Sequence, residues 1–155
     1  MIILWTTNNM WGSRLIRWGF GDDCSHVAVQ FGATVYESRL QDGVKSRGLS
    51  DFLSVNQVVH RKVITWSATD ESIAECIVKT KQGSRYDTKA LLWWAVCALG
   101  RRITGRVPAH NQWGDKDQFF CVEVLSGLEG MLGLPGSIDL QMERPHTLWQ
   151  KLMLQ

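Results

Sequence analysis

The chain has 155 residues, of which 45% are hydrophobic and 21% charged, and its formal net charge is +2. This length predicts one domain, residues 1–155, with enough apolar material for a sizeable core. No run of five like charges occurs, so the sequence predicts no nucleic-acid partner, because such proteins gather basic residues on one face. The longest apolar run, residues 90–99, is about half the length of a membrane-spanning helix. We therefore expect no transmembrane segment.

The first residues, Met1 to Trp5, lack the charged start, long apolar stretch and small-residue cleavage site of a signal peptide. They predict a protein that is cytoplasmic as synthesised. For such a protein, action on a cell wall would need another delivery route, such as lysis or a phage particle.

Alternation and turn residues in the first half of the chain predict strands and a hairpin. Val27, Val29 and Phe31 alternate as in a half-buried strand, and a glycine turn leads into the next strand. The predicted elements are strands at 2–6, 25–31, 35–38 and 57–66, a helix at 12–18, a turn at 41–44 and a short amphipathic segment at 49–53.

The second half switches to helical spacing. Ser67 is a plausible N-cap, Gly83 and Gly100 are predicted helix ends, and Pro145 suits a first helical turn. We expect helices from 68 to 82, 89–99, 119–132 and from 145, with a long loop at 101–118. This order predicts an α+β domain with an antiparallel sheet packed against helices.

Three residues suggest nucleophilic catalysis. Cys121 starts a predicted helix, where the helix N-terminus and a nearby imidazolium would stabilise a thiolate. The N–H groups of that helix could also hold a developing oxyanion. His26 opens a strand after a polar turn, and Glu37 lies on the paired strand, where it could orient the imidazole ring. Residue types and spacing alone leave open a buried structural cysteine, a surface histidine and an exposed glutamate.

Several short motifs occur in a recognisable order: Ser25-His-Val-Ala-Val29, Val35-Tyr-Glu-Ser38 and Phe120-Cys-Val-Glu-Val-Leu125. Residues 12–18, Asp42-Gly-Val44, Tyr86-Asp87 and a late Pro145-x-x-Leu148 accompany them. This series resembles the permuted branch of the NlpC-type papain-like cysteine hydrolases, in which histidine precedes cysteine. The resemblance implies a circularly permuted papain-like fold, with Cys121 as the nucleophile, His26 as the base and Glu37 as its partner. It implies neither a metal nor an organic cofactor.

The same resemblance suggests the substrate. Relatives often cleave amide bonds in the peptide stems of peptidoglycan, and others hydrolyse or transfer the acyl chains of lipids. We expect a peptide or acyl substrate, with Ser25 and Tyr86 as the substrate-binding residues. The apolar Leu91-Leu-Trp-Trp94 favours the lipid alternative if it is exposed. Val122 stands where serine is usual, which leaves a non-catalytic binding or structural module as a third reading.

A metal site is a further alternative for Cys24 and His26. Cys24-x-His26 could supply one pair of ligands, with His60, His110 or His146 completing the set. Structural zinc sites normally use two closely spaced pairs, and the four cysteines are too far apart to provide the second. The sequence therefore predicts no metal site.

Overall fold

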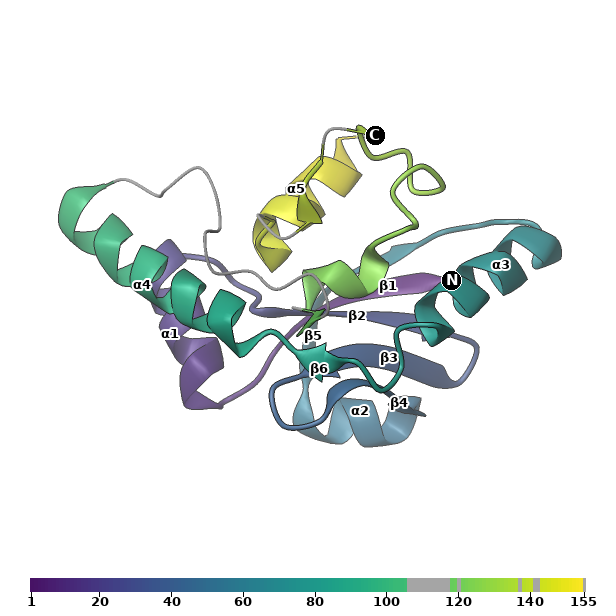
Figure 1. Ribbon diagram of the computed structural model, residues 1–155, viewed down its shortest axis with the longest axis horizontal. Coiled ribbons are helices and arrows are strands. Elements are labelled where there is room, and N and C mark those ends of the chain that lie inside the picture. The colour runs from purple at the N-terminus through teal and green to yellow at the C-terminus, as the bar shows by residue number, and fades with distance from the viewer. Residues whose placement is uncertain (106–117, 120, 137, 141–142, 155) are drawn as a thin grey trace.

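The computed structural model describes residues 1–105, 118–119, 121–136, 138–140 and 143–154. Its centre is a five-stranded antiparallel sheet in the order β4-β3-β2-β1-β5 (Figure 1). The strands are β1 (Ile2–Thr7), β2 (His26–Phe31), β3 (Thr34–Arg39), β4 (Gly43–Gly48) and β5 (Gln57–Val63). The helices are α1 (Trp11–Phe20), α2 (Leu49–Val55), α3 (Ala68–Lys79), α4 (Thr88–Thr104), α5 (Pro145–Met153) and the 3-10 helix η1 (Val122–Leu125). The α+β class and the antiparallel sheet are confirmed.

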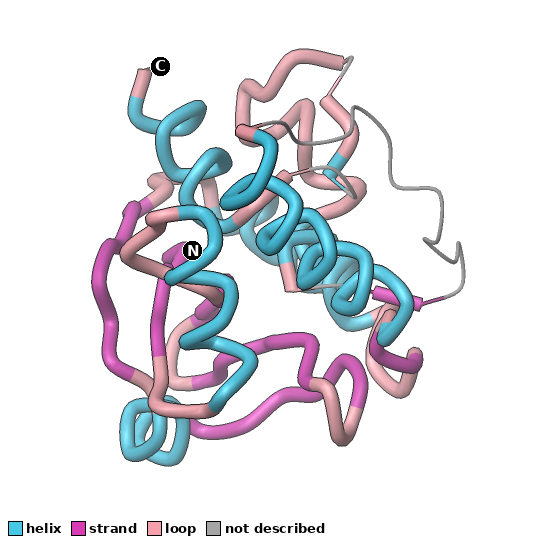
Figure 2. Tube along the Cα trace, turned by 90° about the vertical axis from the view of Figure 1, so that its left-hand side faces the viewer, coloured by secondary structure: helices cyan, strands magenta, loops and turns pink. Residues whose placement is uncertain are grey.

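The two faces of the sheet bury different amounts of apolar surface. On one face, α2 covers a small cluster made by Leu4, Ala28, Val35 and Phe52. The opposite face carries the main core, to which α1, α3, α4, α5 and η1 all contribute (Figures 1 and 2). Alternate residues of each strand point to opposite faces, so Trp5, Val27 and Val29 enter the main core.

The predicted hairpin is confirmed and fixes the position of the polar residues. In the β2–β3 ladder Ala28 is opposite Glu37, and Phe31 is opposite Thr34. His26 lies two residues before Ala28, so His26 and Glu37 are on the same face as diagonal neighbours, within reach of long side chains. The strand register, rather than the turn alone, therefore brings the two side chains together.

Two expectations about the middle of the chain are wrong. Residues 43–48 form β4 and pair along the whole length of β3, although 43–44 were expected in a turn and 45–48 were assigned to no element. The helix expected to stop at Gly100 continues to Thr104, and Gly105 ends it in the left-handed conformation. Side chains on the added turn hold it in place, because Arg101 donates to the Phe20 carbonyl and Arg102 to the Trp18 carbonyl.

The helix expected over residues 119–132 is also wrong. Gln118–Phe119 form a short strand, β7, which runs parallel to β6 (Arg85–Tyr86). Of the described residues in this range only η1 is helical, because Ser126 is extended at ψ 142° and Gly127 adopts a φ of +80°, which a helix cannot accommodate. The apolar side chains that suggested a long helix are nevertheless buried: Val122, Val124 and Leu125 in η1, and Leu128 in the turns that follow. Cys121 therefore precedes a single helical turn.

Candidate active site

His26 and Glu37 form a buried pair at the end of the sheet. The Nε2 atom of His26 lies 2.8 Å from Oε2 of Glu37. The histidine side chain is 16% exposed and the glutamate side chain 3%. The structure thus brings together the two residues that the sequence assigned as base and orienting acid. Because Nε2 is engaged by Glu37, Nδ1 is the ring nitrogen that remains for another partner.

Arg47 belongs to the same cluster and was missed in the sequence. Its guanidinium lies 2.6 Å from Oε1 of Glu37 and stacks over the Phe52 ring at 4.9 Å. Arg47 is opposite Val35 in the β3–β4 ladder, so it is a diagonal neighbour of Glu37 on one face. The signal that could have found it is the alternation of Lys45 and Arg47 on a third strand.

Cys121 lies next to His26. It is buried, with 2% of its surface exposed, and its backbone is already helical just before η1. Side chains of η1 pack against β2. The side chain of Cys121 interacts with the His26 imidazole closely enough to be among the main influences on the pKa of His26. All three residues proposed as a triad are therefore contiguous in space, although 95 positions separate His26 from Cys121 in the chain.

The electrostatics of the cluster favour a charged imidazole. Burial alone would lower the pKa of His26, but the side-chain and electrostatic interactions with Cys121 and Glu37 raise it to about 9. Burial acts to raise the pKa of Glu37, yet the hydrogen bond from His26 and the charges of His26 and Arg47 hold it below its usual value. At neutral pH His26 is thus an imidazolium between two acidic groups.

A hydrogen bond fixes the segment that carries Cys121 to the strand that carries Glu37. Ser38, next to Glu37, donates its hydroxyl to the carbonyl of Phe119 at 2.5 Å. The N–H of Asp87 reaches the same carbonyl at 3.5 Å. The Phe119 carbonyl lies two residues before the thiol, so these bonds set the approach of Cys121 to the hairpin.

A cleft of about 650 Å³ opens beside the pair, and His26, Glu37, Ser25 and Tyr86 all line it. Ser25 is buried and its hydroxyl lies 2.5 Å from that of Ser13, so it is held by α1. Burial raises the pKa of Tyr86 well above its usual value, and the nearby Cys121, Asp87 and Glu123 add to the rise. Tyr86 therefore keeps its proton and remains a hydrogen-bond donor. The buried Cys121 does not belong to the described wall of the cleft.

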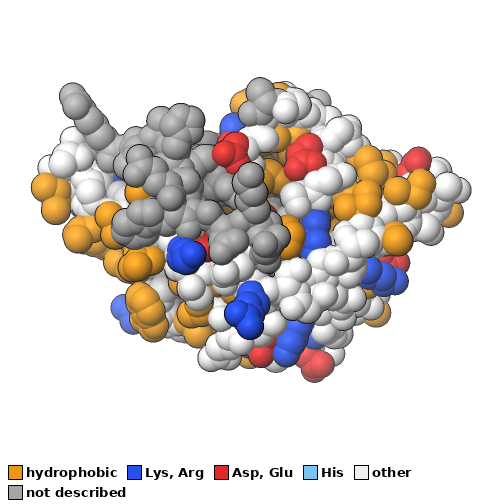
Figure 3. Space-filling view, in the orientation of Figure 1, with side chains coloured by type: hydrophobic (Ala, Val, Ile, Leu, Met, Phe, Trp, Pro, Cys, Tyr) orange, Lys and Arg blue, Asp and Glu red, His pale blue; other side chains and the backbone are white. Residues whose placement is uncertain are grey.

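The rim of the cleft is partly apolar. Met10, Trp11, Leu40 and Val55 are exposed and line the cleft, together with the exposed polar residues Asn9 and Gln41. The apolar surface continues along α1 and α4, where Figure 3 shows hydrophobic side chains gathered at the left of the molecule. Of the motif at 91–94, only Leu92 is strongly exposed, because Trp93 and Trp94 are buried. Further exposed apolar residues on these helices are Trp18, Val96, Leu99 and Ile103.

The cysteine-histidine metal ligand set considered above does not assemble among the described residues. His26 is occupied by Glu37, and Cys24 is fully buried in the core, where burial and the neighbouring Asp23 raise its pKa far above the usual thiol value. His60 and His146 instead meet Asp23, as described below. His110 lies outside the described residues.

Comparisons with known protein families, curated proteins and solved structures give no match to this chain. Among the described residues, none of the helices combines the length and the apolar character required to cross a bilayer.

Proposed function

We propose that this protein is a cysteine-dependent hydrolase of the permuted papain-like kind, which cleaves amide bonds through an acyl-enzyme intermediate. One observation carries the proposal: His26 lies 2.8 Å from Glu37 and next to Cys121, and its interactions with these two residues raise its pKa to about 9. Such a cysteine–imidazolium pair, with a carboxylate behind the ring, is the arrangement that activates a thiol.

In the proposed reaction the Cys121 thiolate attacks the substrate carbonyl carbon, and a C–S bond forms as the carbonyl electrons move to oxygen. Collapse of this intermediate breaks the C–N bond, and His26 gives its proton to the leaving amine. His26 then takes a proton from water, the hydroxide attacks the thioester, and the acid leaves as the C–S bond breaks. The proton on His26 restores the ion pair. Glu37 holds the ring in position and stabilises its charged form throughout.

The substrate is a peptide or acyl compound that fits beside His26, and peptide stems of peptidoglycan are the first class to test. Tyr86 lines the cleft and would contact the bound substrate through its place in the wall. The Ser25 hydroxyl is already hydrogen-bonded to Ser13, so Ser25 would contribute by shaping the cleft wall that the substrate contacts. A cytoplasmic or phage-associated location stays a prediction.

A second candidate, hydrolysis or transfer of lipid acyl chains, is favoured by the apolar part of the rim. Trp11 is 70% exposed beside the opening, and tryptophan suits the boundary between water and lipid. Co-sedimentation with liposomes separates the two: an acyl-lipid enzyme binds them, and Trp11→Ala weakens binding. A peptide amidase stays in the supernatant and releases amines from peptidoglycan fragments.

The thiol chemistry itself can be tested without a known substrate. The protein is treated with iodoacetamide at pH 7, and mass spectrometry measures the alkylation rate of each cysteine. We expect Cys121 to react faster than the exposed Cys76 despite its burial, and His26→Ala to slow Cys121 by about tenfold or more. Cys76 provides the internal control, since its rate should not change. A Cys121 that reacts no faster than Cys76, or that ignores His26→Ala, would overturn the hydrolase proposal and favour a non-catalytic module.

A further inference from the structure

A second histidine–carboxylate cluster is formed by three residues outside the candidate active site, Asp23, His60 and His146. Asp23 precedes β2, His60 is on β5 and His146 is in the first turn of α5. Nε2 of His60 is 2.7 Å from Oδ2 of Asp23, and Nδ1 of His146 is 3.0 Å from Oδ1. One carboxylate thus faces two imidazoles from three separate parts of the chain.

These three groups offer a ligand set for a metal ion. One nitrogen from each histidine and one oxygen of Asp23 all lie within 4.8 Å of one another. In a tetrahedral zinc site, with bonds of about 2.0–2.1 Å, neighbouring ligand atoms are about 3.3 Å apart. A small movement of each side chain away from its hydrogen bonds would therefore place all three around one cation.

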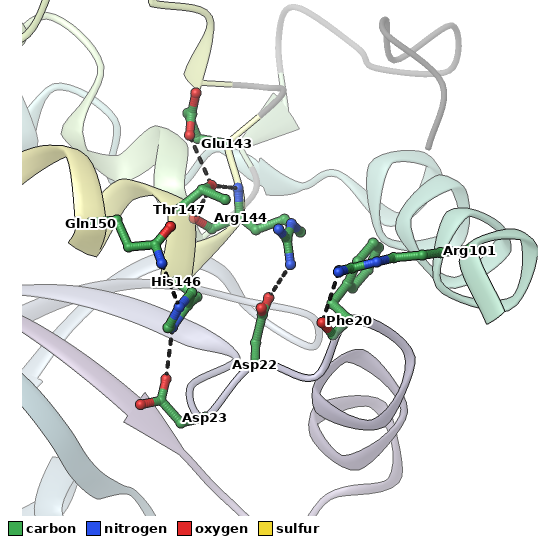
Figure 4. Close-up of polar contacts among 9 residues, drawn as sticks. All are labelled: Phe20, Asp22, Asp23, Arg101, Glu143, Arg144, His146, Thr147 and Gln150. Carbon is green, nitrogen blue, oxygen red and sulfur yellow. Dashed lines mark hydrogen bonds and ion pairs between the residues drawn. The ribbon is translucent and has the colours of Figure 1, made fainter. Parts of the chain in front are cut away.

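Surrounding residues hold both rings in this orientation. His60 stacks on Trp149 with ring centroids 4.4 Å apart and an interplanar angle of 7°. The amide of Gln150 lies 3.1 Å from Nε2 of His146, on the side away from Asp23 (Figure 4). With a cation on Nδ1 of His146, Nε2 would carry the ring proton. The Gln150 amide would then rotate so that its oxygen accepts a hydrogen bond from that N–H. Ligating histidines typically have such a partner on the second nitrogen.

The cluster is also accessible to solvent, and it lies where the loop before β2 contacts α5. Asp23 is 46% exposed, and His60 and His146 are partly exposed, so an ion can enter from solvent. Next to it, Arg144 at the N-cap of α5 pairs with Asp22 at 2.5 Å (Figure 4). The loop before β2 is therefore attached to α5 at two adjacent points, one of them the candidate ligand set.

We propose that Asp23, His60 and His146 form a binding site for a divalent transition-metal ion, with zinc as the best fit, that ties α5 to β5 and to the loop leading into β2. Two imidazoles and one carboxylate suit zinc and similar metals, whereas calcium and magnesium prefer oxygen alone. Water would complete the coordination on the exposed side. This site is separate from the cysteine chemistry and does not depend on it.

Zinc titration by calorimetry tests the proposal in the full chain carrying Cys76→Ser and Cys121→Ala, which removes the exposed thiol and the thiol beside His26. We expect one equivalent of zinc to bind, and His60→Gln or His146→Gln to weaken binding by more than about 100-fold. His110→Gln, a matched substitution elsewhere in the chain, should leave the affinity unchanged. Absence of binding, or equal binding by all three histidine variants, would overturn the site and leave a hydrogen-bonded contact only.

A second measurement covers the case in which a variant does not fold. Two-bond ¹H–¹⁵N spectra of the unsubstituted chain report each imidazole nitrogen separately. One equivalent of zinc should shift the Nε2 signal of His60 and the Nδ1 signal of His146. If neither nitrogen responds, zinc does not bind at this cluster and the proposal fails.

Discussion

The two histidine–carboxylate clusters use the same chemical groups in different surroundings. Glu37 is 3% exposed and is held by His26 and Arg47, whereas Asp23 is 46% exposed and pairs with the two histidines His60 and His146. Burial makes the first cluster a fixed charge arrangement, because a buried carboxylate needs its partners. Because the Asp23 cluster is exposed, its side chains could give up their hydrogen bonds and bind a cation from solvent, as proposed above. The comparison teaches that the environment of a carboxylate, rather than its pairing with histidine, decides which chemistry it supports.

The largest expected difference between the clusters is in stability. Glu37→Gln leaves the Arg47 guanidinium and the His26 imidazolium without their anion, so it should lower the free energy of unfolding by about 4 kcal/mol. Asp23→Asn, the matched change in the exposed cluster, should cost less than about 1 kcal/mol in metal-free buffer. Urea denaturation of the two variants measures both values. Equal losses would show that burial does not separate the clusters.

The pH dependence of stability should report the buried cluster specifically. The pKa of His26 is about 9 in the folded chain and about 6.5 when unfolded. Folding therefore favours the protonated form, and its contribution is complete below pH 6.5 and is lost as the pH rises through 9. We expect the wild type to lose up to roughly 3 kcal/mol across this window relative to His26→Gln. Parallel stability curves for the two proteins would contradict the raised pKa.

The smallest expected effect is on the reactivity of the thiol. Glu37→Gln should slow alkylation of Cys121 at pH 7 by about tenfold, the equivalent of one unit in the pKa of His26. Asp23→Asn should change that rate by less than about twofold, because its carboxylate contacts His60 and His146 rather than His26. Rates are compared where circular dichroism shows both variants folded. A larger effect from Asp23→Asn would mean that the two clusters are coupled through residues 23–26.

Local patterns were enough to predict much of the fold and the proximity of His26 and Glu37. The alternation of residues 25–31 and the turn after it specify a hairpin, and the hairpin register brings Glu37 to His26. The triad assignment also used the resemblance to permuted papain-like hydrolases, which supplied the distant Cys121. The permuted papain-like fold itself stays a prediction.

Features that depend on tertiary contacts could not be read locally. In residues 43–48 only Val44 is apolar, so β4 depends on its pairing with β3, and Arg47 was missed together with it. The buried Val122, Val124, Leu125 and Leu128 resemble a helix in spacing, yet Gly127 turns the chain away. Asp23, His60 and His146 have no regular spacing, because three different elements bring them together.

The hydrogen bond from Ser38 to the Phe119 carbonyl has a consequence for folding kinetics. It joins residues 81 positions apart, and closing so long a loop is entropically costly and slow. His26 and Glu37 are only 11 positions apart, so their hairpin can form early, even on a growing chain. We therefore expect refolding to protect the amides of β2 and β3 before Cys121 acquires its native reactivity. A nascent chain would lack the contact between Cys121 and His26 until the segment around η1 has packed against β2.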